Sequence, residues 1–305
     1  MKRFIKIFII SSIIISIIIF SAIPPFMMKD MVNEHVNFTQ IYKAEDYGLT
    51  SEKLTLKTSD GVNISAQEVY VKTPKAVVIF ISGIENPSVT AFFDHARLLK
   101  EHGYASILYD MRGHGDSEGD EISLGFKEYQ DTKAVVDYIR SNVKYEYVPI
   151  VVYGLSMGAA TAINSIGEIK EIDALVSISA YSSWEDVFCD NMEAMGAPKA
   201  LAAIEKPFVK IYTTFKYGVH SYLVNPKEEI KKLGKRPALI MHTKGDTQVP
   251  YKSFERIMEN APKQVETWTR EGNHHSFVNE DDFDNLKSDP EYTQRIISFL
   301  DKYFK

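Results

Sequence analysis

Hydrophobic residues follow three patterns along this chain, and each pattern predicts a different kind of element. Residues 7–23 are almost wholly apolar, with scattered serines. Beyond about residue 50, short β-rich runs alternate with stretches that carry apolar residues at helical spacing. Between about residues 184 and 233 the alternation stops, and an aromatic-rich composition favours two or three helices. The chain is therefore expected to contain an N-terminal apolar helix, an α/β domain and a helical insertion.

The alternating part of the chain predicts an α/β fold with a mostly parallel central sheet and helices on both faces. A hairpin is expected to precede the parallel strands, because Ser59-Asp60-Gly61 is a turn sequence between two β-rich runs. The expected strands cover 54–58, 62–71, 76–81, 104–109, 148–153, 173–180, a run from 236, and 265–270, and the expected helices cover about 88–102, 126–141 and a stretch from 159.

The apolar N-terminal stretch predicts an uncleaved membrane anchor. With residues 24–28 it approaches the roughly 20 residues that span a bilayer core. Ala22-Ile23-Pro24 is a poor signal-peptidase site, because proline is unsuited beside the cut. Lys2, Arg3 and Lys6 are expected to stay in the cytoplasm. The apolar stretch would then cross the membrane once, and the folded domain would lie on the extracellular side. Cleavage of this segment, with secretion of the domain, is the alternative.

The length of 305 residues is sufficient for one large α/β domain with an insertion. The segment after the anchor is polar and mixed in charge, so it is expected to be a juxtamembrane connector. The expected divisions are 1–28 for the anchor, 29–50 for the connector and 51–305 for the domain, with the insertion at about 184–233.

The pentad Gly154-Leu155-Ser156-Met157-Gly158 carries the strongest chemical signal. It lies between the predicted strand 148–153 and a helix-forming stretch, and this placement of Gly-x-Ser-x-Gly is typical of a nucleophile elbow. The sharp turn is expected to strain the serine backbone, while the flanking glycines leave room for it. The hydroxyl is then held at the positive end of the following helix. Ser156 is the candidate nucleophile.

Candidate partners for this serine follow later in the chain. Asp246 comes after the predicted strand from residue 236, and His274 and His275 come after the predicted strand 265–270. The carboxyl ends of strands in an open α/β sheet form the edge where sites occur. Asp281 and Asp282 compete with Asp246 for the role of the acid, but they are expected to be charges at the start of a helix.

These motifs, with the run Tyr109–Gly119, resemble the α/β-hydrolase superfamily over roughly residues 50–305. Within it, the chain is similar to bacterial single-domain serine esterases and to the catalytic domains of prolyl oligopeptidases. The resemblance implies a triad of Ser156, Asp246 and His275. His275 is preferred to His274 because relatives place the base three residues after the loop glycine. The resemblance also implies that the insertion forms a cap that shapes the substrate pocket.

One position departs from the family pattern. Most relatives carry His-Gly after the third strand, whereas this chain has Ser82-Gly83-Ile84. By resemblance, the backbone N–H groups of Ile84 and Met157 form the oxyanion hole. The missing histidine leaves open what braces this loop, whereas the kept Gly83 still allows the backbone turn that supplies the oxyanion donor. His114, which precedes the elbow in the chain, is expected to be a structural loop residue.

Composition narrows the classes of partner. The net charge is −6, and acidic and basic residues are interspersed, so no basic stripe suits a nucleic acid. A single cysteine, Cys189, rules out an intramolecular disulfide. Neighbouring histidines rarely bind one ion, and the sequence has no His-Glu-x-x-His motif or cysteine cluster. Neither a metal nor a cofactor is expected.

The sequence thus predicts a membrane-anchored serine hydrolase that cleaves a carboxylic ester through an acyl-enzyme on Ser156. An acyl lipid or another apolar ester is the expected substrate, because the insertion is rich in aromatic residues and the anchor holds the domain near lipid. Peptidase or amidase activity, acyl transfer, and a non-catalytic binding role on the same fold are the alternatives. The oligomeric state is left open.

Overall fold

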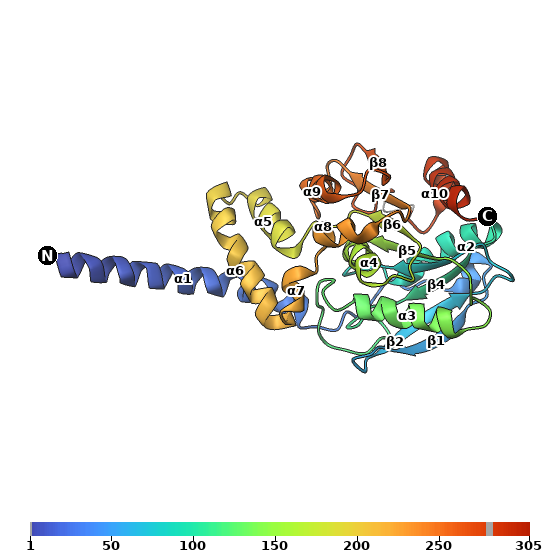
Figure 1. The fold of residues 1–305 in the computed structure, drawn as a ribbon, viewed down its shortest axis with the longest axis horizontal. Helices are drawn as coiled ribbons and strands as arrows, with labels where there is room; N and C mark the ends of the chain where they lie inside the picture. Colours follow the sequence, from blue (N-terminus) through green and yellow to red (C-terminus); the bar gives the residue numbers. More distant parts are fainter. Residues whose placement is uncertain (1, 279–282) are drawn as a thin grey trace.

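In the computed structural model, which describes residues 2–278 and 283–305, eight strands form a single sheet (Figure 1). The strand order is β1-β2-β4-β3-β5-β6-β7-β8, in which β2 is antiparallel to β1 and β4 and the remaining neighbours are parallel. The predicted hairpin and mostly parallel sheet are confirmed. The strands are β1 Glu52–Lys57, β2 Asn63–Val69, β3 Val77–Ile81, β4 Ala105–Tyr109, β5 Ile150–Leu155, β6 Ala174–Ile178, β7 Ala238–Thr243 and β8 Glu266–Arg270.

Helices cover both faces of this sheet, as the sequence predicted. Alternate residues of the buried strands face opposite cores, so that in β3 Ile79 packs into one core and Phe80 into the other. One core contains α3 and α4, and the other contains α2 and α10. The helices of the domain are η1 Ala44–Tyr47, η2 Val89–Phe92, α2 Phe93–Glu101, α3 Tyr129–Ser141, α4 Met157–Glu168, α9 Lys252–Asn260, η5 Leu286–Ser288 and α10 Pro290–Tyr303.

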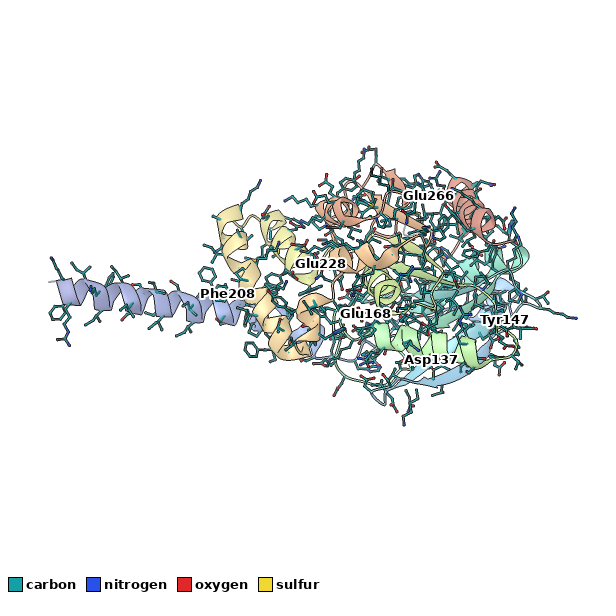
Figure 2. All side chains as sticks on the ribbon, viewed as in Figure 1. Asp137, Tyr147, Glu168, Phe208, Glu228 and Glu266 are labelled. Carbon is teal, nitrogen blue, oxygen red and sulfur yellow. The ribbon has the colours of Figure 1, made fainter. Side chains whose placement is uncertain are left out.

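Helix α1, Lys2–Val32, projects from the domain with most of its side chains exposed (Figures 1 and 2). Among the described residues it is the helix long and apolar enough to cross a membrane, and it has equally the character of a signal sequence. It runs through Pro24 and Pro25, so the boundary expected at residue 28 lies inside the helix. Its last turns are buried against the domain through Met28 and Val32.

Residues 33–50, within the segment expected to be a juxtamembrane connector, pack on the domain at several points. The backbone of Val36 hydrogen-bonds that of Gly113 and Gly115, at 2.8 and 2.9 Å, and forms an isolated bridge with His114. Phe38 and Leu49 are buried. The segment is polar on average, so its few widely spaced apolar residues did not indicate in the sequence that it packs on the domain.

The predicted insertion is helical: α6 packs against α5, α7 and α1, while α8 and η3 pack on α4 (Figure 1). Asp186 is fully buried between Lys206 and Lys227, which both contact its carboxylate. Burial alone would raise the pKa of Asp186, but the two ammonium groups hold it well below its ordinary value. The elements of the insertion are α5 Trp184–Ala194, α6 Lys199–Tyr217, α7 His220–Leu223, α8 Pro226–Glu229 and η3 Ile230–Leu233.

Arg112 joins three separate parts of the domain. Its guanidinium lies 2.7 Å from the carboxylate of Asp131 on α3 and 2.7 Å from that of Asp60 in the β1–β2 turn. The side chain of Asp131 is completely buried, and burial raises its pKa to about 7, while the pairing with Arg112 favours the charged form. The loop after β4 is thereby fixed to the hairpin and to α3.

We expect Arg112→Met to lower the free energy of unfolding by about 3–5 kcal/mol, because the substitution leaves the Asp131 carboxylate buried without its partner. Chemical denaturation of the full chain in detergent, followed by circular dichroism, measures the loss. Lys53→Gln is the control: its ion pair with Asp116 is largely exposed, and we expect a loss below about 1 kcal/mol. Equal losses in the two variants would contradict the role given to Arg112.

Candidate active site

Ser156 occupies a strained turn between β5 and α4. β5 ends at Leu155 and α4 begins at Met157, and the intervening serine has φ 56° and ψ −120°. A side chain other than glycine rarely adopts this backbone conformation, which costs roughly 1–3 kcal/mol and is found mostly at functional sites. The strain predicted for the elbow is confirmed.

The two glycines of the pentad are required by close backbone contacts. A Cβ atom on Gly154 would lie 2.2 Å from the carbonyl oxygen of Gly158, and one on Gly158 would lie 2.3 Å from the carbonyl oxygens of Ile81 and Ser82. The elbow is therefore packed directly against the end of β3. This contact fixes the position of Ser156 relative to the loop that follows β3.

The structure brings Asp246 and His275 together from the loops after β7 and β8. Nδ1 of His275 lies 2.7 Å from Oδ2 of Asp246, and both side chains are buried. The carbonyl oxygen of His275 accepts a hydrogen bond of 2.7 Å from the Ser179 hydroxyl. Within residues 2–278 and 283–305, Nε2 of His275 has no hydrogen-bond partner. Its neighbour His274 is exposed.

The Asp246 carboxylate is held in its charged form. Its second oxygen accepts hydrogen bonds of 2.9 Å from the backbone N–H groups of Gln248 and Val249. Burial alone would raise the pKa of Asp246, but His275 and these backbone donors lower it below its ordinary value. His242 lies behind the carboxylate, at 3.6 Å, and burial lowers its pKa, so that it is neutral near pH 7.

The loop expected to carry an oxyanion donor lies beside the elbow. Gly83 is adjacent to Ser156, since a Cβ on this glycine would lie 3.5 Å from the serine Cβ. Ile84 lines the same pocket as Ser156. Met157 is the first residue of α4, where backbone N–H groups have no partner within the helix.

His114 contacts the candidate oxyanion loop in a way that the sequence did not reveal. It is fully buried, with Nε2 3.0 Å from the carbonyl oxygen of Ile84 and Nδ1 2.8 Å from that of Arg112. A histidine from the loop after β4 therefore braces the loop in which relatives carry their own histidine. Its structural role was predicted, but its partner was not.

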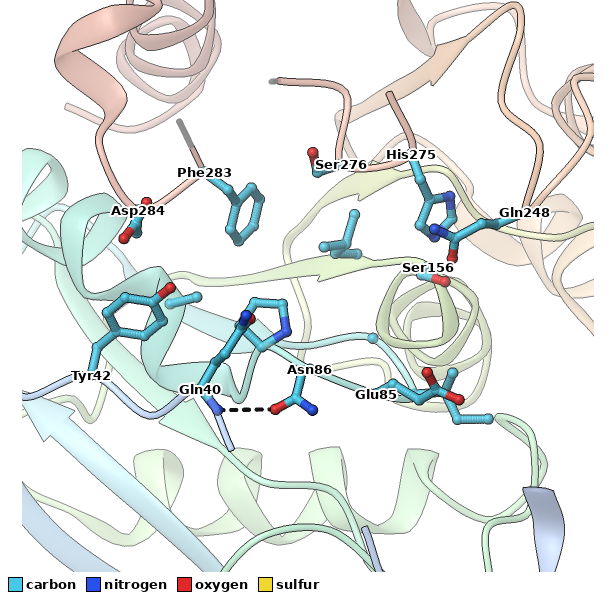
Figure 3. Close-up of a pocket in the computed structure, with 15 residues that line it drawn as sticks. Gln40, Tyr42, Glu85, Asn86, Ser156, Gln248, His275, Ser276, Phe283 and Asp284 are labelled. Carbon is cyan, nitrogen blue, oxygen red and sulfur yellow. Dashed lines mark hydrogen bonds between the residues drawn. The ribbon is translucent and has the colours of Figure 1, made fainter. Parts of the chain in front are cut away.

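A pocket of about 560 Å³ opens above Ser156 and His275 (Figure 3). Gln40 and Tyr42, from the segment expected to be a connector, form part of its wall, and the Gln40 backbone N–H donates to Asn86 Oδ1 at 3.0 Å. Nothing in the sequence singled out these two residues. The described lining consists of Gln40, Tyr42, Gly83, Ile84, Glu85, Asn86, Pro87, Ala91, Leu155, Ser156, Gln248, His275, Ser276, Phe283 and Asp284.

The insertion does not contribute to this lining, since the described residues around the pocket all lie outside 184–233. The expectation that the insertion shapes the substrate pocket is therefore not supported: α6 packs against α1, while α8 and η3 pack on α4 and α9. Asp281 and Asp282 lie outside the described residues. In the described part of the chain, no three histidine, cysteine or acidic side chains are grouped as metal ligands would be.

Comparison with known proteins places this geometry in a family. Residues 72–235 match the family model described as serine aminopeptidase, S33. Among curated proteins, the chain is 24% identical to the uncharacterized protein YqkD of Bacillus subtilis over 231 residues, which cover 75% of this chain and 72% of that protein. It is 22% identical to human protein ABHD12B over 207 residues, 64% of this chain and 52% of that protein.

Solved structures share the fold. The Pyrococcus furiosus esterase Pf2001 superposes with a TM-score of 0.65 at 24% identity, over 89% of this chain and 99% of that chain. The α/β hydrolase GrgF from Penicillium sp. sh18 gives a TM-score of 0.63 at 18% identity, over 84% of this chain and 99% of that chain.

We expect Gly158→Ala to lower the free energy of unfolding by about 1–3 kcal/mol, because the new methyl group meets backbone rather than a movable side chain. The loss should appear although alanine is the better helix former. Gly83→Ala is the matched control, since its Cβ makes only an ordinary contact. Thermal unfolding of both variants tests this, and an unchanged Gly158→Ala protein would show that the elbow relaxes easily.

Proposed function

Because the chain belongs to the serine aminopeptidase S33 family and is an enzyme of the α/β-hydrolase type, we propose that it is a serine hydrolase that cleaves carboxylic esters. The observation that carries the proposal is the Asp246–His275 pair. In the described residues Nε2 of His275 has no hydrogen-bond partner, and His275 lines the same pocket as the strained Ser156. In the proposed triad Ser156 is the nucleophile, His275 the base and Asp246 the residue that orients it.

In the first half-reaction, His275 Nε2 takes the proton of the Ser156 hydroxyl as Oγ bonds to the acyl carbon of the ester. The negative charge that develops on the carbonyl oxygen is stabilised by the N–H groups of Ile84 and Met157. The C–O bond then breaks, and His275 returns the proton to the departing alkoxide. An alcohol leaves, and the acyl group stays on Ser156.

In the second half-reaction, water loses a proton to His275 as its oxygen bonds to the acyl carbon. The bond to Oγ breaks, the proton passes from His275 to Ser156, and a carboxylic acid is released. Throughout, the charged Asp246 favours the tautomer with the proton on Nδ1 and stabilises the imidazolium. The low pKa of this carboxylate suits that role.

The charges around the pocket favour a neutral or cationic substrate. In the described lining, Glu85 and Asp284 are the charged side chains, and both are acidic. A substrate with a carboxylate or phosphate near the scissile bond is repelled by them. The same pair supports a second candidate, an aminopeptidase, because it suits the ammonium group at a peptide N-terminus.

We also propose that α1 is an uncleaved single-pass anchor. Lys2, Arg3 and Lys6 at its start favour a cytoplasmic N-terminus, and the domain at its other end then lies outside. Retention of the domain at an extracellular membrane surface suits an apolar ester substrate.

We expect a fluorophosphonate probe to label the full chain in detergent, and Ser156→Ala and His275→Ala to lose labelling. His274→Ala is the matched control and should keep labelling, because that residue is exposed and the hydrogen bond to Asp246 is made by His275. Asp246→Asn should lower turnover of a p-nitrophenyl ester by about 10⁴-fold through loss of the correct tautomer. Labelling retained in His275→Ala would reject the proposed base.

The two candidate substrates are separated by turnover of p-nitrophenyl butyrate and of an aminoacyl p-nitroanilide. We expect the ester to be the better substrate by kcat/KM. We also expect the p-nitrophenyl half-ester of succinic acid to have a lower kcat/KM than the butyrate. The double variant Glu85→Gln, Asp284→Asn should reduce the ratio of the two kcat/KM values about tenfold, because it removes roughly 1.4 kcal/mol of repulsion. A preference for the anilide would favour the aminopeptidase.

A further inference from the structure

Helix α6 carries large apolar residues on its exposed side, and its buried side contains polar residues beside Ala202, Val209 and Tyr217. Phe215 is 86% exposed, whereas Glu205 on the same helix is completely buried. Thr213 and Ser221 are buried as well. Single exposed apolar residues are common on soluble proteins, but a continuous row is not. The outer face of α6 and α7 is the row of exposed apolar residues Ile204, Ile211, Phe215, Val219 and Leu223.

Three of the four lysines of α6 turn away from this outer face, and the fourth, Lys199, is exposed at the start of the helix, before Ile204. Lys206 and Lys210 turn toward α5, where they pair with Asp186 and Glu185. Lys216 turns toward the domain, where it lies 3.2 Å from Glu121. Side chains that would normally solvate an exposed helix are therefore committed to the protein side.

The outer face is continuous with the apolar surface of α1. Helix α6 crosses α1 (Figure 1), and the rings of Phe20 and Phe208 stack with their centroids 5.6 Å apart. Figure 2 shows Phe208 at this crossing. The contact fixes the depth of α6 relative to α1.

The uncharged stretch of α1 indicates how deep Phe20, and with it Phe208, lies in the bilayer. No charged residue occurs between Lys6 and Lys29, and these 22 residues are about 33 Å long in a helix, close to the roughly 30 Å hydrocarbon core of a bilayer. Phe20 precedes the Met28 end of this stretch by eight residues, which corresponds to about 12 Å. Phe208, stacked on it, then lies at the level of the acyl chains.

We propose that the outer face of α6 and α7 is inserted in the leaflet of the bilayer nearer the domain, beside α1. The partner is the lipid itself, because the face is apolar, lacks outward lysines and adjoins a helix with the length of a membrane span. An amphipathic helix in this position buries its apolar side about 5–10 Å below the headgroups. The inference rests on the proposed anchor and does not depend on the esterase proposal.

The test uses the full chain with Cys189→Ser, which removes the one cysteine in the sequence. An environment-sensitive fluorophore is attached to Ile211→Cys or Phe215→Cys, and the protein is reconstituted in phosphatidylcholine nanodiscs with or without a nitroxide on the acyl chain. Tyr147→Cys is the water-exposed control, since Tyr147 is 88% exposed and lies far from α1 in Figure 2. Ile13→Cys, midway along α1, is the lipid control.

We expect the labels at 211 and 215 to lose fluorescence to the lipid nitroxide, as the label at 13 does, and to resist aqueous iodide. The label at 147 should show the opposite response. Quenching by iodide at 211 and 215 would overturn the proposal. Protection of the labels at 211 and 215 from both quenchers would overturn the proposal in favour of a second copy of the chain. A label at 13 that the lipid nitroxide does not quench would overturn it too, because α1 would then not lie in the bilayer. Ester turnover, measured on the same samples, reports separately on the proposed function.

Discussion

The site depends on one steric constraint, the direct contact of the elbow backbone with the end of β3. Gly158 has no space for a Cβ because the carbonyl oxygens of Ile81 and Ser82 are too close. The start of α4, the serine turn and the loop after β3 are consequently held in one rigid group. Because the backbone rather than flexible side chains sets their spacing, the candidate nucleophile and both candidate oxyanion donors keep a fixed geometry before any substrate binds.

The rest of the site is attached to this group by buried polar contacts. His114 connects the loop after β4 to Ile84, while Arg112 connects the same loop to α3 and to the first hairpin. On the other side, Asp246 places His275 through one carboxylate oxygen and uses the other to hold its own loop. The Arg112–Asp131 and Asp246–His275 contacts are buried, so the loss of either would leave an unsatisfied group in the interior.

The sequence predicted those parts of the structure that depend on local patterns. Short β-rich apolar runs identified most of the strands, and the Gly-x-Ser-x-Gly pentad identified the strained turn. The contact of His114 with Ile84 could not be predicted, because 30 residues separate them and no local pattern records the pairing. The wall formed by Gln40 and Tyr42 was missed for a related reason. Those side chains are polar and occur in a segment of mixed charge, and only the fold of the domain brings them to the pocket.

The segment that connects α1 to the pocket wall determines what a proteolytic cut after α1 removes from the domain. Val32 ends the helix in the core, Val36 pairs with the loop after β4, and Gln40 and Tyr42 follow within a few residues. The tether and the pocket wall are thus one stretch of polypeptide. Proteolytic release of the domain between residues 43 and 50 would remove Gln40 and Tyr42 together with the proposed anchor, so a shed form of this protein would differ in substrate selection from an attached form.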